Sequence, residues 1–375
     1  MKTINLKFYR LSCIFLLLLI NSNLFSQTTR YKWKYNTITH KLLQIEELNE
    51  ASTKIVTQDF DNKYLLLDNI IDNCKKSVSN IDLTTINDEI QAKKVLKIID
   101  STLSKNLFTV CVKIENLSDA LTLKSKGTLN CMYTNDISPI DYRVRDFSLS
   151  KKFYHVDCDL FSFIYLGIGE ALGIPVSFIE VPNHNFIRWN LSDNTFINWD
   201  VNMGKTYLNN EYKTGIPYLT SGFSDLEETK YHYLNNLNNN EVLGYYYFVI
   251  GRLQKKNQKY KNAENLYLKS IQYRPSSPIA KYCLAYMIVF TGAYNSSNDF
   301  LLASRLAKEA YDIDNDHKEI VETYACSLAL LSRFEEAKKV LKSYKKYDPD
   351  LYNAFEKNNN GIEIYQKKHH SDVFN

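Results

Sequence analysis

Three residues of the types used in nucleophilic catalysis occur within one stretch of the chain, residues 155 to 200. They are Cys158, His184 and Asp200. A cysteine thiolate can attack a carbonyl carbon, an imidazole can take the thiol proton, and a carboxylate can hold the imidazole in the required orientation. These residues therefore indicate cysteine-dependent chemistry on a carbonyl group, provided that the fold brings them together.

The cysteine is predicted to begin a helix. Apolar residues recur at helical spacing from residue 158 to residue 172, and Gly173 and Pro175 follow as residues that end helices. Cys158 then lies in the first turn. Unpaired backbone N–H groups and the positive end of the helix dipole stabilise a thiolate at that position.

Two acidic neighbours oppose this effect. Asp157 and Asp159 flank the cysteine, and their negative charges raise the pKa of a nearby thiol. The position of Cys158 in the helix is therefore not enough to activate it. A cationic partner such as a protonated histidine is needed.

A β-hairpin is predicted to carry the other two residues. The segments VSFIEV with NFIRW, and TFINW after them, are rich in β-branched and aromatic residues, and NLSDN between the last two is typical of a turn. With the turn centred on Ser192, His184 lies directly opposite Asp200. Opposed residues have Cβ atoms ~4.5–5.5 Å apart, which allows a carboxylate to hold an imidazole.

At these residues the chain resembles the transglutaminase-like superfamily, which has a papain-like α+β core. The resemblance rests on a cysteine opening a helix that ends in Gly173-Ile174-Pro175, on the histidine of the step VPNH, and on the aspartate of the step NWD. It is closest to a bacterial branch with V-P-x-H and N-W-D/E steps. The resemblance implies that Cys158 is the nucleophile, His184 the base and Asp200 the residue that orients the base.

Other interpretations of the same residues remain open. A cysteine on an apolar helix can be a structural core residue. A zinc site formed by His155, Cys158 and His184 is chemically possible because zinc accepts nitrogen and sulfur ligands, although no second pair of ligands supports it. The core could also be an inactive scaffold or a peptide-binding module that uses the same cleft.

Other motifs in the sequence are weaker indications of a functional site. Cys131 is a rival nucleophile, but no amphipathic helix follows it. The segment GIGEALG has the wrong spacing for a nucleotide loop and lies inside the predicted helix, so no cofactor is expected. Trp189 and Trp199 could line a cleft, but packed strand tryptophans are the more common case.

The first 26 residues are predicted to be a signal peptide. Lys2, Lys7 and Arg10 precede an apolar run from Leu11 to Ile20, which is shorter than the ~20 residues of a membrane span. The mature chain would be exported to the periplasm, the cell surface or the medium, without a transmembrane segment. Removal of three positive charges takes the net charge from +4 to +1, which argues against nucleic-acid binding.

The rest of the chain is expected to divide into four parts. Residues 27–105 form helices, one of them beginning at a capping pattern from Thr85 to Asp88. Residues 106–240 form the transglutaminase-like core, and residues 241–351 form helical repeats. Residues 352–375 are a polar, frayed tail.

The repeats resemble tetratricopeptide repeats. Ala263 recurs as Ala303 and then as Ala337, at intervals of 40 and 34 residues, and Pro275 recurs as Asn315 and Pro349. The resemblance implies three stacked helix pairs that form a solenoid. Such arrays commonly bind a peptide or a partner protein, so a protein partner is expected here.

Overall fold

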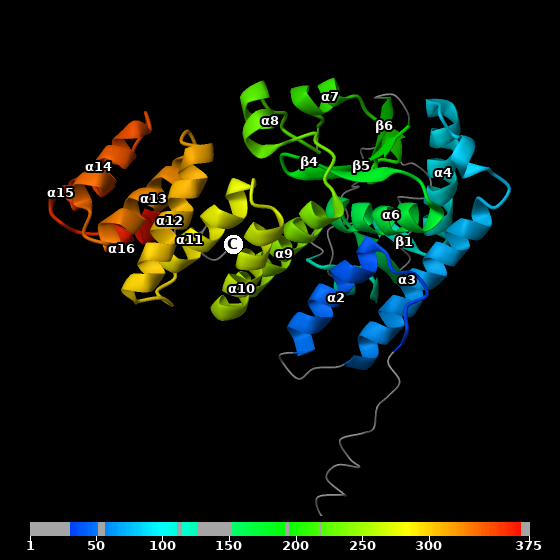
Figure 1. Ribbon diagram of the computed structural model, residues 1–375, viewed down its shortest axis with the longest axis horizontal. Coiled ribbons are helices and arrows are strands. Elements are labelled where there is room, and N and C mark those ends of the chain that lie inside the picture. Colours follow the sequence, from blue (N-terminus) through cyan, green and yellow to red (C-terminus); the bar gives the residue numbers. More distant parts are fainter. Residues whose placement is uncertain are drawn as a thin grey trace, which may run out of the picture.

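The computed structural model describes residues 31–51, 57–110, 115–125, 152–191, 195–217 and 219–368 (Figure 1). The predicted signal peptide, Cys131 and the middle of the predicted hairpin turn lie outside these ranges. The chain is a mixed α+β protein, as expected, in which two small sheets are surrounded by helices. No helix in the described ranges has the length and apolar character needed to span a membrane.

The N-terminal segment is helical, as predicted. It contains α2 (Ile38–Ala51), α3 (Thr57–Ser77) and α4 (Glu89–Lys105). The predicted start of α4 needs a correction. Thr85 belongs to a short 3-10 turn (Leu83–Thr85), and Asp88 itself caps α4 by accepting a hydrogen bond from the Gln91 backbone N–H at 2.9 Å.

A three-stranded sheet leads into the helix that carries the cysteine. Strand β3 (Lys152–Val156) lies between β1 (Phe108–Val110), to which it is parallel, and β2 (Leu123–Ser125), to which it is antiparallel. The short helix α5 (Leu117–Ala120) connects β1 and β2. Because β3 ends at Val156, the chain passes from this sheet into the next helix within two residues.

Helix α6 extends from Cys158 to Leu172, as predicted. Asp157 caps its start by accepting a hydrogen bond from the Leu160 backbone N–H at 3.1 Å. Gly173 ends it in the left-handed conformation at φ 72°, which glycine adopts without steric cost. Most side chains of α6 are buried, because the helix lies between the second sheet and helices α2 and α3.

The second sheet is antiparallel and contains β4 (Val176–Val181), β5 (His184–Asn190), β6 (Phe196–Asp200) and β7 (Lys205–Thr206) in that order. The predicted strands are therefore present, but the register is different. Trp199 pairs with Ile187, so the register is displaced by two residues from the one that places His184 directly opposite Asp200. A shift of two residues keeps both side chains on the same face of the sheet.

The two faces of this sheet pack against different helices. On one face, Phe178 of β4 stacks on Phe163 of α6, with ring centroids 5.0 Å apart. On the other face, Phe186 of β5 stacks on Tyr212 of α7 (Asn209–Thr214) at 4.1 Å. Helix α8 (Asp225–Tyr231) follows α7 on this side of the molecule (Figure 1).

In the described part of the chain after α8, eight helices follow, and they pack largely as consecutive pairs. They are α9 (Asn239–Lys256), α10 (Tyr260–Tyr273), α11 (Pro278–Phe290), α12 (Ser297–Ile313), α13 (Lys318–Leu330), α14 (Phe334–Ser343), α15 (Pro349–Glu356) and α16 (Ile362–Lys368). The predicted tail is wrong as far as Lys368. Tyr365 of α16 is buried and stacks on Phe290 at 4.0 Å, so this segment is packed rather than frayed.

Small residues occur where paired helices approach each other closely. Ala263, Ala303 and Ala337 are completely buried. A Cβ atom on Gly251 of α9 would lie 2.9 Å from the Tyr267 ring of α10, so the two helices meet where a larger side chain would collide. The predicted spacing of small residues is thus explained by helix packing.

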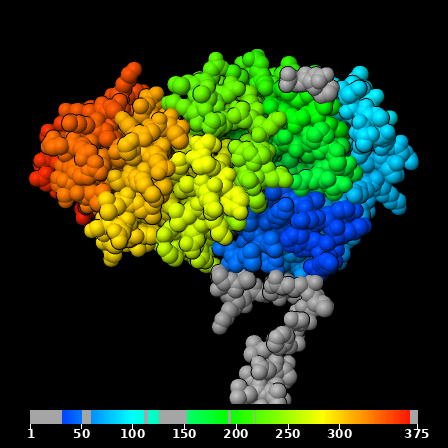
Figure 2. Space-filling view, viewed as in Figure 1, coloured from blue at the N-terminus to red at the C-terminus, as the bar shows by residue number. Residues whose placement is uncertain are grey.

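The C-terminal helices pack directly on the preceding part of the protein. Val242, Tyr246 and Ile250 of α9 belong to the same hydrophobic core as the N-terminal helices, α6 and the second sheet. The region of α9 and α10 lies directly against the blue N-terminal helices and the green core in Figure 2. Arg274, which follows α10, also forms an ion pair with Glu180 of β4 at 2.7 Å.

Candidate active site

The Asp200 carboxylate is completely buried and has a partner for each oxygen. Oδ2 contacts His184 Nε2 at 2.7 Å and accepts a hydrogen bond from the Tyr212 hydroxyl at 3.3 Å. Oδ1 accepts backbone N–H groups from Asn202 at 3.1 Å and Met203 at 2.9 Å. The turn after β6 therefore holds the carboxylate in one orientation, aimed at the imidazole.

His184 is the first residue of β5 and is almost completely buried. The residue before it, Asn183, has a positive φ of 60°, which turns the chain between β4 and β5. Because Asp200 contacts Nε2, the neutral ring carries its proton on that nitrogen and keeps a lone pair on Nδ1. Nδ1 is thus the nitrogen that can take a proton from a nucleophile.

Cys158 is the first residue of α6 and keeps part of its surface exposed. Its thiol donates a hydrogen bond to Asp159 Oδ1 at 3.4 Å and lies beside the backbone N–H of Asn185. Burial raises the pKa of the Cys158 thiol well above its ordinary value, and the charges of Asp159 and Asp157 add to the effect. The Asn185 N–H acts in the opposite direction.

The structure joins two of the three predicted residues by a hydrogen bond and places the third at the same end of β5. Residues 184 and 185 are consecutive, so the Cys158 thiol beside the Asn185 amide lies next to the strand position of His184. However, Asn185 faces α6 and His184 faces α7. Within the described ranges, no hydrogen bond joins the thiol to the imidazole. Proton transfer therefore requires the thiol to leave Asp159 and turn toward the ring.

The two acidic neighbours of the cysteine are held differently. Asp157 caps α6, and burial together with the nearby charge of Asp159 raises the pKa of its carboxyl group. Asp159 accepts hydrogen bonds from the Asn185 side-chain amide and from the Tyr245 hydroxyl, the latter at 2.9 Å. Hydrogen bonds from neighbouring side chains thus compensate part of the Asp159 charge beside the thiol.

Three residues of this site were not predicted from the sequence: Asn185, Tyr212 and Tyr245. Asn185 adjoins the predicted histidine, and its adjacent position is the one signal that could have identified it. Tyr212 and Tyr245 reach the site from α7 and α9. Tyr245 occurs in a run of three tyrosines within the predicted repeats, where nothing local indicates contact with the core.

The other candidate residues have structural surroundings that do not form a site. Trp189 and Trp199 are buried in the core against α6, so they are packing residues. Among the described residues, no group of three or more histidine, cysteine, aspartate or glutamate side chains could hold a metal ion, and His155, Cys158 and His184 form no such group. The first two glycines of GIGEALG, Gly167 and Gly169, lie inside α6, and Gly167 faces Thr39 of α2.

Comparisons with known proteins give no family assignment. No protein-family model matches the chain, and no curated protein sequence matches it significantly.

Proposed function

We propose that the protein carries out cysteine-dependent chemistry on a peptide or carboxamide bond, with Cys158 as nucleophile, His184 as base and Asp200 as the residue that orients the base. The observation that carries this proposal is the buried contact between His184 Nε2 and Asp200 Oδ2, at the strand end beside Cys158. The resemblance of these residues to the transglutaminase-like superfamily agrees with this assignment.

The proposed reaction begins when His184 Nδ1 takes the thiol proton. The thiolate then attacks the carbonyl carbon, and the tetrahedral intermediate collapses as the imidazolium gives its proton to the leaving amine or ammonia. A thioester on Cys158 results. Water would complete hydrolysis, with release of an acid and the free thiol, and an amine would complete acyl transfer to form a new amide.

A second candidate function is a peptide-binding scaffold without catalysis. The observation that favours it is the hydrogen bond from the Cys158 thiol to Asp159 rather than to His184. Burial and the two acidic neighbours raise the pKa of that thiol, which keeps it protonated. In this alternative, the His184–Asp200 pair supports the fold of the second sheet.

The helical array and the N-terminal segment extend the proposal. We infer from the repeating pattern of small residues that α9 to α14 form tetratricopeptide-like pairs that bind a protein or peptide partner. The charged and apolar start of the chain suggests that the protein acts outside the cytoplasm.

The proposed function can be tested with an activated ester that does not depend on the natural substrate. Treatment with p-nitrophenyl acetate should acetylate Cys158 as a thioester that hydroxylamine removes, and mass spectrometry of peptides locates the modification. A Cys158→Ala variant should lose this product. A Cys283→Ala variant should retain it, because Cys283 is an ordinary free thiol whose pKa burial raises to about 11. Equal acetylation of Cys158 and Cys283 would favour the scaffold.

A further inference from the structure

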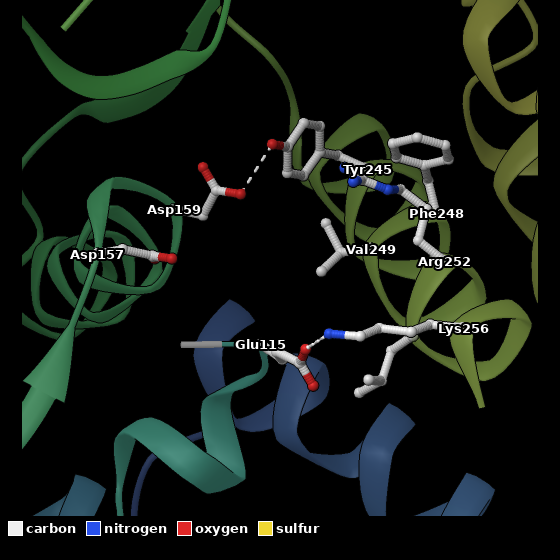
Figure 3. Close-up of a pocket in the computed structure, with 9 residues that line it drawn as sticks. Glu115, Asp157, Asp159, Tyr245, Phe248, Val249, Arg252 and Lys256 are labelled. Carbon is white, nitrogen blue, oxygen red and sulfur yellow. Dashed lines mark hydrogen bonds and ion pairs between the residues drawn. The ribbon is translucent and has the colours of Figure 1, made fainter. Parts of the chain in front are cut away.

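A cleft separates the start of α6 from helix α9. Its volume is about 280 Å³. Asp157 and Asp159 line one wall, and Tyr245, Phe248 and Arg252 line the opposite wall (Figure 3). The first helix of the C-terminal array thus forms one side of a cavity whose other side belongs to the core.

The candidate nucleophile is adjacent to two of the residues that line this cleft, Asp157 and Asp159. The Cys158 sulfur is 3.4 Å from Asp159 Oδ1, and Asp159 is one of the lining residues. Asp159 is in turn connected to α9 through the hydroxyl of Tyr245 at 2.9 Å. A substrate that extends along α9 would therefore bring one of its groups to the thiol.

Most charges in the cleft are already compensated. Asp159 accepts hydrogen bonds from Asn185 and Tyr245, and Lys256 forms an ion pair with Glu115. Arg252 differs from them. It is exposed, its guanidinium carbon lies 5.8 Å from the Phe248 ring centroid, and it has no ion pair within the described ranges. Figure 3 shows its side chain directed toward Tyr245.

We propose that this cleft binds the acyl part of the substrate as a short peptide with a carboxylate, which Arg252 binds bidentately. This inference rests on the proposed function, because it places the reacting carbonyl at Cys158. A guanidinium matches the two oxygens of a carboxylate, and the Phe248 ring beside it supports a fixed orientation. The cavity has room for a few residues rather than a folded protein.

The spacing between thiol and carboxylate follows from helix geometry. Arg252 is seven residues after Tyr245, which corresponds to about 10 Å along the α9 axis, and its side chain leans back toward Tyr245. An extended peptide covers ~3.3 Å per residue. The carboxylate is therefore expected one to three residues from the carbonyl that reacts at Cys158.

The test uses peptides that alkylate Cys158 without any catalytic turnover. N-acetylated peptidyl chloromethyl ketones would begin with Asp, Asn or Lys followed by one to three glycines, so that the peptide precedes the reactive carbonyl as the acyl part of the substrate does. The thiolate forms a carbon–sulfur bond and displaces chloride. For the best spacer, the Asp peptide should react with the wild type about fivefold faster than the Asn peptide, and the Lys peptide should be slowest.

Two variants separate Arg252 from general charge effects. Arg252→Gln should reduce the Asp to Asn rate ratio to about one. Arg305→Gln should leave the ratio unchanged, because Arg305 is an exposed arginine of α12 outside the cleft. A wild-type ratio near one, a ratio that survives Arg252→Gln, or a faster Lys peptide would overturn the inference.

Failure of the proposed function has a different signature. If Cys158 is an unactivated thiol, all the peptides react slowly and His184→Ala changes nothing, but the ratio between Asp and Asn peptides persists and still depends on Arg252. If only the cleft assignment is wrong, alkylation depends on His184 and shows no preference for the Asp peptide.

Discussion

At the scale of single residues, the Asp200 carboxylate accepts hydrogen bonds from the turn after β6 and from α7 in addition to its contact with the imidazole. Two backbone N–H groups and the Tyr212 hydroxyl accompany His184 around it. These partners fix the orientation of the carboxylate. Such a carboxylate is well placed to keep the histidine in the tautomer that a base requires.

Asp200→Asn should therefore slow acetylation of Cys158 by p-nitrophenyl acetate by about a hundredfold or more, because the amide no longer stabilises the imidazolium or selects the tautomer. Cys158→Ala should remove the reaction completely. Asp312→Asn is a suitable control, since Asp312 forms an exposed ion pair with Lys308 on α12. If Asp200→Asn reacts as fast as this control, Asp200 does not serve the proposed base.

The positions of the three candidate site residues in the fold could be predicted because each lies at a recognisable place in a helix or strand pattern. Cys158 opens a mostly apolar helix, and His184 and Asp200 lie on neighbouring strands of a hairpin. Tyr245 could not be predicted, because it reaches Asp159 from 86 residues away along the chain. That contact depends on how α9 packs on the core, and no sequence motif encodes it.

At the scale of elements, α6 was predictable because its ends are set by its own residues, Asp157 and Gly173. The hairpin strands were predictable from their composition, but the register was not. A turn one residue longer or shorter moves the pairing, and the apolar alternation is satisfied by any shift of two residues. Consecutive strand residues point to opposite faces of the sheet, but which helix covers the His184 face and which covers the Asn185 face depends on long-range packing.

The packing of α6 on α2 yields a specific prediction. A Cβ atom on Gly167 would lie 2.2 Å from Thr39 Oγ1, and Thr39 donates its hydroxyl to the Phe163 carbonyl. Gly167→Ala should therefore lower the free energy of unfolding by about 1–3 kcal/mol through overpacking, as measured by urea denaturation.

The double variant Thr39→Ala with Gly167→Ala provides the control for this prediction. Thr39→Ala removes the nearest atom that the new methyl group would strike, while Thr39 Cβ and Thr37 Oγ1, each at 2.9 Å, remain. The double variant should be more stable than the sum of the two single effects predicts. Strictly additive effects would mean that the two positions do not collide.

At the scale of the whole molecule, helix α9 joins the array to the core. Tyr245 contacts the candidate site, and its neighbour Tyr246 donates a hydrogen bond to Glu46 of α2. Glu46 also accepts the backbone N–H groups of Leu117 and Ser118 in α5. One buried carboxylate thus connects the N-terminal helices, the segment before the site and the array.

Glu46 should make stability depend on pH. Burial raises its pKa from 4.5 to about 7 despite its hydrogen bonds, so the folded protein binds a proton more tightly than the unfolded chain. The stability that this tighter proton binding contributes is present in full below pH ~4.5. It is lost as the pH rises through about 7, and the free energy of unfolding falls by about 3 kcal/mol in total. The free energy of unfolding of Glu46→Gln should fall less than that of the wild type over that pH range, as measured by denaturation curves at several pH values. Parallel curves for the two proteins would contradict the assignment.

The shared core also limits where the chain can be divided. A chain that ends at Asn240 lacks Val242, Tyr246 and Ile250, which are all buried, and each such loss costs about 2–5 kcal/mol. The sum of these losses equals or exceeds the free energy of unfolding of a typical domain. The shortened chain should not unfold cooperatively, whereas one that ends at Ser277 should. Cooperative unfolding of the shorter chain would show that α9 is dispensable.

The broad organisation could be predicted because composition and periodicity change along the chain. Helices, a mixed central part and paired helices follow one another as expected. The ordered end of the array was missed because residues 352–368 look polar locally, and the burial of Tyr365 depends on contact with Phe290 of a distant helix. Contacts with distant residues therefore determine whether a segment is packed when its own sequence shows no clear hydrophobic periodicity.

The central claim is that His184 takes the proton of Cys158, and the pH dependence of Cys158 alkylation by iodoacetamide tests it most directly. The wild-type rate should rise at lower pH than the rate of His184→Ala, because only the wild type can form a thiolate–imidazolium pair. His232→Ala, which removes an exposed histidine, should match the wild type. Superimposable profiles for wild type and His184→Ala, both with a thiol pKa at or above the ordinary ~8.5, would contradict the claim.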